Sequence, residues 1–108
     1  MSYNYRAGVL LTAAVATGAG VPLGLTGVFQ TVTMQVAFTG GTLTALTSKI
    51  QGSVDGGNNW FDLTTASTVV SGETQFSVDK PFSSVRGNIT TYTVATGTPA
   101  VTVSFAAV

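Results

Sequence analysis

The residues of this chain that are best suited to chemistry gather in one stretch, Ile50 to Leu63, which reads IQGSVDGGNNWFDL. Asp55 and Asp62 carry carboxylates on either side of an Asp-Gly-Gly-Asn turn, and Asn58 adds an amide oxygen. Calcium takes oxygen ligands of this kind, so Asp55, Asn58 and Asp62 are the candidate metal ligands. Their spacing matches no EF-hand loop. The favoured interpretation is a turn in which Asp55 accepts backbone N–H bonds.

A pair of carboxylates can also perform acid–base chemistry, as in glycosidases. Here Asp55 and Asp62 sit on one short hairpin, and Glu73 and Asp79 are the remaining acids of the chain. The sequence contains no His and no Cys, which removes the usual general base and the thiolate nucleophile. Its many Ser and Thr residues therefore lack an activating base. We expect no enzymatic activity and no cofactor.

The same hairpin carries amide and aromatic side chains that could contact a partner. Trp60 is expected to pack into the core at the base of the hairpin, whereas Phe61, on the opposite parity, is expected to be exposed. Asn58, Asn59 and Phe61 are therefore candidate interface or binding residues.

Arg86 falls in the middle of an expected strand, on the parity opposite its apolar neighbours. A structural ion pair with Glu73 or Asp79 on a neighbouring strand is the favoured role, ahead of a role in binding.

Charge is unusually scarce in this 108-residue chain, because only 7% of it is Asp, Glu, Lys or Arg and the net charge is zero, whereas a soluble domain carries about 25%. A surface without long-range self-repulsion favours association. The basic residues are scattered and form no patch for nucleic acid: they are Arg6, Lys49, Lys80 and Arg86.

The N-terminus resembles a secretory signal in its apolar run from Ala7 to Ala16, but Gly8 and Thr12 interrupt the run and we expect no cleavage. No apolar segment reaches the ~18 residues of a membrane span. Residues 1–8 are expected to form an arm in which Tyr3 and Tyr5 anchor a neighbouring subunit. Residues 9–108 are expected to form one domain.

Alternating hydrophobicity predicts seven to eight strands spaced about ten residues apart. They are Val9 to Val15, Val28 to Phe38, Leu46 to Val54, Trp60 to Leu63, Thr68 to Val70, Glu73 to Val78, Ser84 to Val94 and Ala100 to Val108. Glycines at Gly40-Gly41 and Gly97 are expected to end strands. The pattern indicates an all-β, antiparallel sandwich of jelly-roll type.

Inward and outward positions also follow from the alternation. In each strand one parity is expected to line the core: Val28, Val32, Met34, Val36 and Phe38; Leu46, Ser48, Ile50, Gly52 and Val54; Phe76 and Val78; Val85, Gly87, Ile89 and Thr91; Val101, Val103 and Phe105. The opposite, threonine-rich parity is expected to face solvent or a partner.

Residues Val28 to Val108 resemble small virion proteins of tailed bacteriophages. The resemblance lies in QGSVDGGNNWFDL, in FSSVRGNITTY and in the final strand AVTVSFAA. These are similar to a Gly-Ser-Leu-Asp-Gly-x-Asn-Trp element, an apolar-Arg-(Ala or Gly)-Asn strand and an apolar C-terminal strand. The Ser-x-Asp-Gly-x-x-Trp element is also similar to that of discoidin-like carbohydrate-binding sandwiches.

The resemblance implies a structural protein located in the virion, either a capsid decoration or cement protein or a small head or tail accessory subunit. Its partners would be coat protein, other virion proteins and copies of itself, with a trimer as the favoured oligomer. The alternative is a discoidin-like module that binds a glycan in host-surface adhesion, through loops near Asp55 to Phe61. Such a module needs Phe61, Tyr92 and the Asn58-Asn59 tip to cluster on one exposed loop end.

Overall fold

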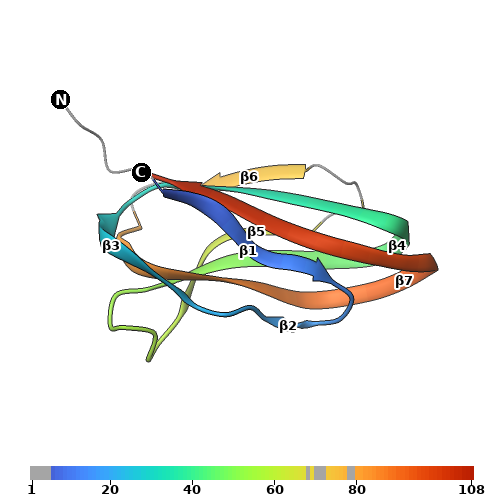
Figure 1. The fold of residues 1–108 in the computed structure, drawn as a ribbon, viewed down its shortest axis with the longest axis horizontal. Coiled ribbons are helices and arrows are strands. Elements are labelled where there is room, and N and C mark those ends of the chain that lie inside the picture. The colour runs from blue at the N-terminus through green and yellow to red at the C-terminus, as the bar shows by residue number, and fades with distance from the viewer. Residues whose placement is uncertain (1–5, 68, 70–72, 78–79) are drawn as a thin grey trace.

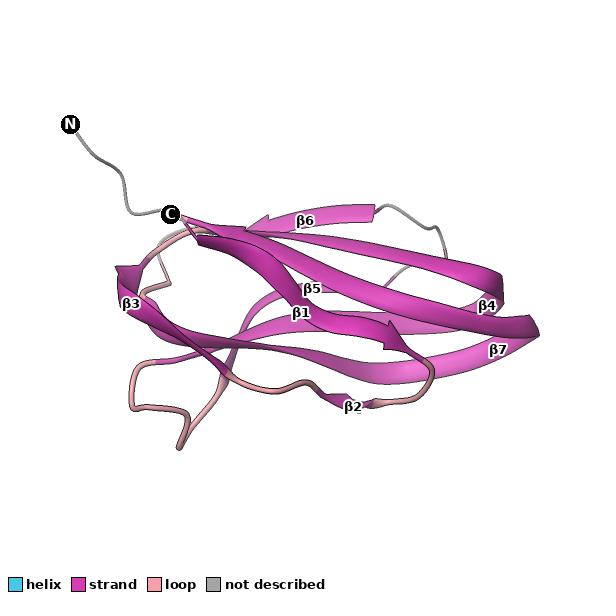
Figure 2. Ribbon diagram, viewed as in Figure 1, coloured by secondary structure: helices cyan, strands magenta, loops and turns pink. Residues whose placement is uncertain are grey.

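The computed structural model describes residues 6–67, 69, 73–77 and 80–108. Within these ranges the chain is all-β and forms seven strands without a helix (Figures 1 and 2). The strands are β1 (Arg6–Ala14), β2 (Gly18–Ala19), β3 (Leu23–Phe29), β4 (Val32–Ser53), β5 (Phe61–Ser67), β6 (Glu73–Ser77) and β7 (Phe82–Ala107). Among the described residues, no helix is long and apolar enough to cross a membrane.

The long strands β4 and β7 form the central antiparallel ladder, which runs from the pair Val32 and Ala107 to the pair Ser53 and Ser84. Both strands fold back near their middle, where Gly41 lies opposite Gly97. In Figure 1 each strand runs to the same end of the molecule and then returns. The ladder therefore contributes to two stacked layers that remain connected as one sheet.

Layer A consists of β1, the second half of β7, the first half of β4, and β6. Layer B consists of β3 with the short β2, the first half of β7, the second half of β4, and β5. All described pairings are antiparallel. The fold is the expected β-sandwich in a single domain.

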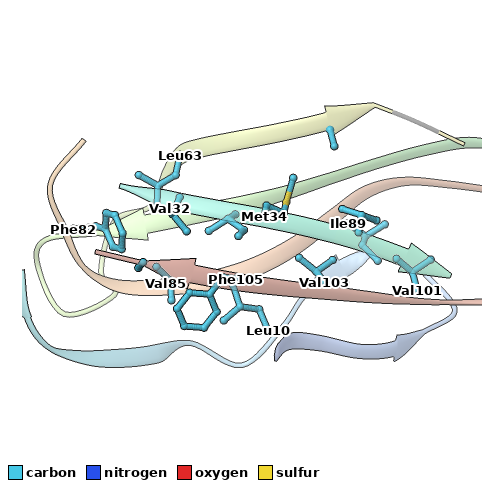
Figure 3. Packing of buried hydrophobic residues seen from close by; sticks show 14 of the residues in the cluster. Leu10, Val32, Met34, Leu63, Phe82, Val85, Ile89, Val101, Val103 and Phe105 are labelled. Carbon is cyan, nitrogen blue, oxygen red and sulfur yellow. The ribbon is translucent and has the colours of Figure 1, made fainter. Parts of the chain in front are cut away.

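The core lies between the two layers and is filled by branched aliphatic and aromatic side chains (Figure 3). Burial of each such side chain contributes about 1.5–3 kcal/mol. The expected inner faces are confirmed at most positions: Val32, Met34, Val36, Leu46, Ser48, Ile50, Val85, Ile89, Val101, Val103 and Phe105 are all buried.

The expected strand Val28 to Phe38 is divided in two. β3 ends at Phe29, and β4 begins at Val32. The N–H groups of Gln30 and Thr31, which lie between these strands, bond to the carbonyl of Val108. The parity changes across this break. Phe29 is 2% exposed and stacks on the Phe82 ring, whereas Val28, expected inside, is 61% exposed.

Alternation also fails at two other expected inner positions. Val54 is 65% exposed, while Ser53, expected outside, is fully buried. β4 ends at Ser53, and the Ser53 hydroxyl bonds to Asp55 and Gly57 in the following loop. Thr91 is exposed because the ladder skips one residue between Thr91 and Ile89, which shifts the phase of β7.

Several element boundaries differ from those expected. The chain bends at Gly40-Gly41 and Gly97, but β4 and β7 continue through these bends. β1 begins at Arg6, inside the segment assigned to the arm. Parts of the expected strand Thr68 to Val70, and Val78, lie outside the described residues.

Candidate functional site

The loop between β4 and β5 is organised around the Asp55 carboxylate. The Ser53 hydroxyl donates to Asp55 Oδ1 at 2.7 Å and accepts the N–H of Gly57 at 2.9 Å. Asp55 Oδ1 also accepts the N–H groups of Asn58 and Asn59, at 3.1 and 3.0 Å. The Asn59 amide donates to Oδ2 at 2.7 Å. Both carboxylate oxygens are therefore used within the loop.

These donors lower the pKa of Asp55 to about 2, with the Ser53 hydroxyl as the largest cause and the Asn59 side chain next. Hydrogen bonds to a carboxylate favour its charged form. The geometry is that of a turn stabilised by an aspartate side chain, with Gly56 and Gly57 at positive φ.

Asp62 belongs to a separate set of contacts on β5. Its Oδ2 pairs with Lys49 Nζ at 2.9 Å, and its Oδ1 accepts a hydrogen bond from Gln51 Nε2 at 2.9 Å. These two donors lower the pKa of Asp62, Gln51 first. Of the candidate ligands, Asp55 and Asn58 thus bond to each other within the loop, whereas Asp62 is engaged separately by Lys49 and Gln51. No cluster of three or more His, Cys, Asp or Glu residues able to hold a metal occurs in the described part of the chain.

A polar network continues across layer B from Asp62. Gln51 Oε1 accepts a hydrogen bond from Arg86 Nε at 2.8 Å and one from Asn88 Nδ2 at 3.3 Å. The Arg86 guanidinium lies 4.6 Å from the centroid of the Trp60 ring, a cation–π contact. The register explains the network, since Gln51 lies opposite both Arg86 and Asp62.

The expected burial of Trp60 in the core is wrong. Trp60 is half-buried, precedes β5 and is absent from the core cluster. Arg86 covers one face of the Trp60 ring, so that face is not free for stacking on a sugar. Phe61 is 36% exposed.

An ion pair with Glu73 or Asp79 was expected for Arg86. The contacts that the structure shows for Arg86 are instead with Gln51 and Trp60. Glu73 lies on β6 in the other layer, opposite Val36. Asp79 lies outside the described residues. The sequence analysis did not single out Gln51, the residue that connects the network. Gln51 and Lys49 occupy outward positions of the same strand, and this shared face could have indicated that Gln51 makes polar contacts.

The candidate binding residues do not all meet at one end of the sandwich. Phe61 pairs with Gly52 next to the loop of Asn58 and Asn59. Tyr92 pairs with Leu46 and donates its hydroxyl to the carbonyl of Pro99. On its other side Gly52 pairs with Val85 of β7, so Val85 marks the level of Phe61 in the sheet. Val85 and Tyr92 are seven positions apart along β7, or roughly 23 Å at about 3.3 Å per residue. Tyr3 and Tyr5 lie outside the described residues.

The outer side of layer A has a different chemistry, and we call it the uncharged face. Its described side chains are small or neutral: Ala7 and Val9 from β1, Thr33, Gln35 and Ala37 from β4, and Thr102, Ser104 and Ala106 from β7. A hollow of about 280 Å³ is lined by Thr33, Gln35, Ser104, Phe105 and Ala106.

No protein-family model matches this sequence, and no curated protein matches it significantly. Solved structures that share its fold include the following two. The SPBc2 prophage-derived protein YomS is 19% identical with a TM-score of 0.62, and the match covers 96% of this chain and 92% of YomS. The PBSX exported protein XepA is 22% identical with a TM-score of 0.65, and the match covers 96% of this chain but 37% of XepA.

Proposed function

We propose that this protein is a non-enzymatic structural subunit of a bacteriophage particle, acting as a capsid decoration or cement protein or as a small head or tail accessory protein. Its mechanism would be to bury neutral sheet surface against copies of itself or other virion proteins and so stabilise the assembly. The phage-derived origin of the structural neighbours supports a phage-associated role.

The uncharged face is the observation that carries the proposal. Burial of a charged group in an interface has a desolvation cost, which a face made of Ala, Val, Thr, Ser and Gln largely avoids. The three strands of the uncharged face lie about 4.8 Å apart, and about eight residues of each present roughly 380 Å². A standard interface buries about 800 Å² on each partner, so this face would supply about half of one.

The glycan-binding alternative is less well supported. It required Phe61, Tyr92 and the Asn58-Asn59 tip to cluster at one exposed end, and Tyr92 instead pairs far from Phe61 along the sheet. One face of the Trp60 ring is covered by Arg86. The carboxylates of Asp55 and Asp62 are also separately engaged, which favours a non-enzymatic role.

Particle composition tests this proposal. Phage particles from the organism that encodes the gene would be purified on a density gradient and analysed by mass spectrometry. We expect peptides of this chain to migrate with the particles in a fixed ratio to coat protein. Peptides confined to the soluble fraction, while coat protein is found in the particle band, would contradict the proposal.

A further inference from the structure

The guanidinium of Arg86 is held in place on the outer side of layer B. Its Nε donates to Gln51 Oε1, and its Cζ lies over the Trp60 ring, 4.6 Å from the centroid. We propose that Arg86 anchors a carboxylate of an acidic partner subunit, so that layer B carries a second docking surface. This inference rests on the proposed function, because it names a contact that the virion subunit would make.

Gln51 is oriented from both sides, which fixes the position of Arg86. The Gln51 amide nitrogen donates to Asp62 Oδ1, while its oxygen accepts from Arg86 and Asn88. Reversal of the amide would place donor against donor. Lys49 in turn holds the other oxygen of Asp62. The rotamer of Arg86 is therefore set before any partner arrives.

The remaining donors of Arg86 suit a carboxylate. A guanidinium has five N–H groups in a rigid fork, and the hydrogen bond to Gln51 uses the one on Nε. Its terminal nitrogens make no other hydrogen bond to the described residues. A planar pair of donors binds a carboxylate through two parallel hydrogen bonds. Because the side chain is already ordered, less entropy is lost on binding.

The surroundings of Arg86 favour an acidic protein surface. Lys49 and Lys80 lie on the same side of layer B, and Lys80 Nζ donates to the carbonyl of Asp62 at 3.3 Å. Three of the four basic residues of the chain thus gather here. The Asp62 carboxylate is already engaged by Lys49 and Gln51. Arginine and tryptophan are both enriched among the anchors of protein interfaces.

The test titrates the full chain with a hexaglutamate peptide at low ionic strength, with hexaglutamine and inorganic phosphate as comparison probes. NMR would follow the Arg86 Nε–H and the indole N–H of Trp60, the only tryptophan of the chain. We expect saturable shifts with hexaglutamate, no shifts with hexaglutamine, and weaker binding of phosphate.

Arg86→Lys keeps the charge but loses the fork, and we expect it to bind hexaglutamate about tenfold more weakly. Arg6→Lys, at the start of β1 in layer A, is the matched control and should bind like the wild type. Unchanged binding by Arg86→Lys, absent shifts, or binding of phosphate as tight as that of hexaglutamate would each overturn the proposal. Particle composition is measured separately, so a negative result here leaves the proposed function standing.

Discussion

Gly41 lies directly opposite Gly97 at the place where β4 and β7 fold back together. A Cβ atom on Gly41 would collide with the carbonyl oxygen of Thr96, and one on Gly97 would lie 2.5 Å from the carbonyl oxygen of Gly40. Gly97 also has a φ of 69°, in the left-handed region. The two strands can enter both layers because glycine occupies both sides of this bend.

Gly97→Ala should therefore destabilise the fold by about 3 kcal/mol, through backbone strain and collision with Gly40. Urea denaturation would measure this change. Gly24→Ala is the control, because Gly24 has no positive φ and an added methyl group there would meet no atom within 4 Å. We expect a change below about 1 kcal/mol there. Equal stability of the two variants would show that the bend tolerates side chains.

Ser48 and Ser53 are both fully buried but differ in their partners. Ser48 Oγ has no hydrogen-bond partner among the described residues, whereas Ser53 Oγ bonds to Asp55 and Gly57. Ser48→Ala should stabilise the protein by up to about 1 kcal/mol, and Ser53→Ala should destabilise it by about 1–3 kcal/mol. Thermal and urea unfolding of the pair would reveal the opposite signs. If Ser48→Ala destabilised the protein as much as Ser53→Ala, this would contradict the finding that Ser48 Oγ lacks a hydrogen-bond partner among the described residues.

The low pKa of Asp55 predicts a defined acid sensitivity. Its folded pKa of about 2 lies below the ordinary value of 3.8, so its ionised form favours folding above about pH 4. This contribution is lost as the pH falls from about 4 through 2. NMR titration should give the Asp55 carboxyl a pKa of about 2, and Asp55→Asn should weaken the pH dependence of unfolding in this window. A titration near the ordinary value would contradict the loop geometry.

The position of Trp60 predicts a modest cost of truncation. Because Trp60 is half-buried outside the core, Trp60→Ala should cost about 1–2 kcal/mol, less than the ~3–5 kcal/mol of a buried aromatic. Met34→Ala is the comparison, since Met34 is fully buried, and it should cost about 2–5 kcal/mol. A larger loss for Trp60→Ala than for Met34→Ala, measured by urea denaturation, would mean that the core extends beneath the loop.

Much of the fold could be predicted from residue alternation. The buried sets around Met34, Ile50 and Val103 were assigned correctly, because a period of two specifies one face of a strand. The positions where strands end or bend could not be predicted in the same way. Whether the chain at Gly40-Gly41 and Gly97 ends a strand or bends within one depends on the partner strand across the ladder. The phase change at Thr91 likewise comes from a bulge set by pairing.

Less of the candidate site could be predicted. The Asp55 turn followed from local chemistry, because Asp, Gly and Asn act within a few residues of one another. The place of Trp60 depended on Arg86, which is 26 positions further along the sequence and reaches it only through strand pairing. Gln51 gained its bridging role in the same way. The uncharged face became visible only when the outer positions of β1, β4 and β7 were aligned.

The mass of the protein in solution tests whether the uncharged face drives association between copies of the chain. Light scattering would be measured over a range of concentrations for the wild type, for Gln35→Arg in the uncharged face and for Thr90→Arg on the exposed part of β7 in layer B. We predict an oligomer for the wild type and Thr90→Arg, and a folded monomer for Gln35→Arg. A wild-type monomer at every concentration, or an oligomer unaffected by Gln35→Arg, would contradict this role of the uncharged face.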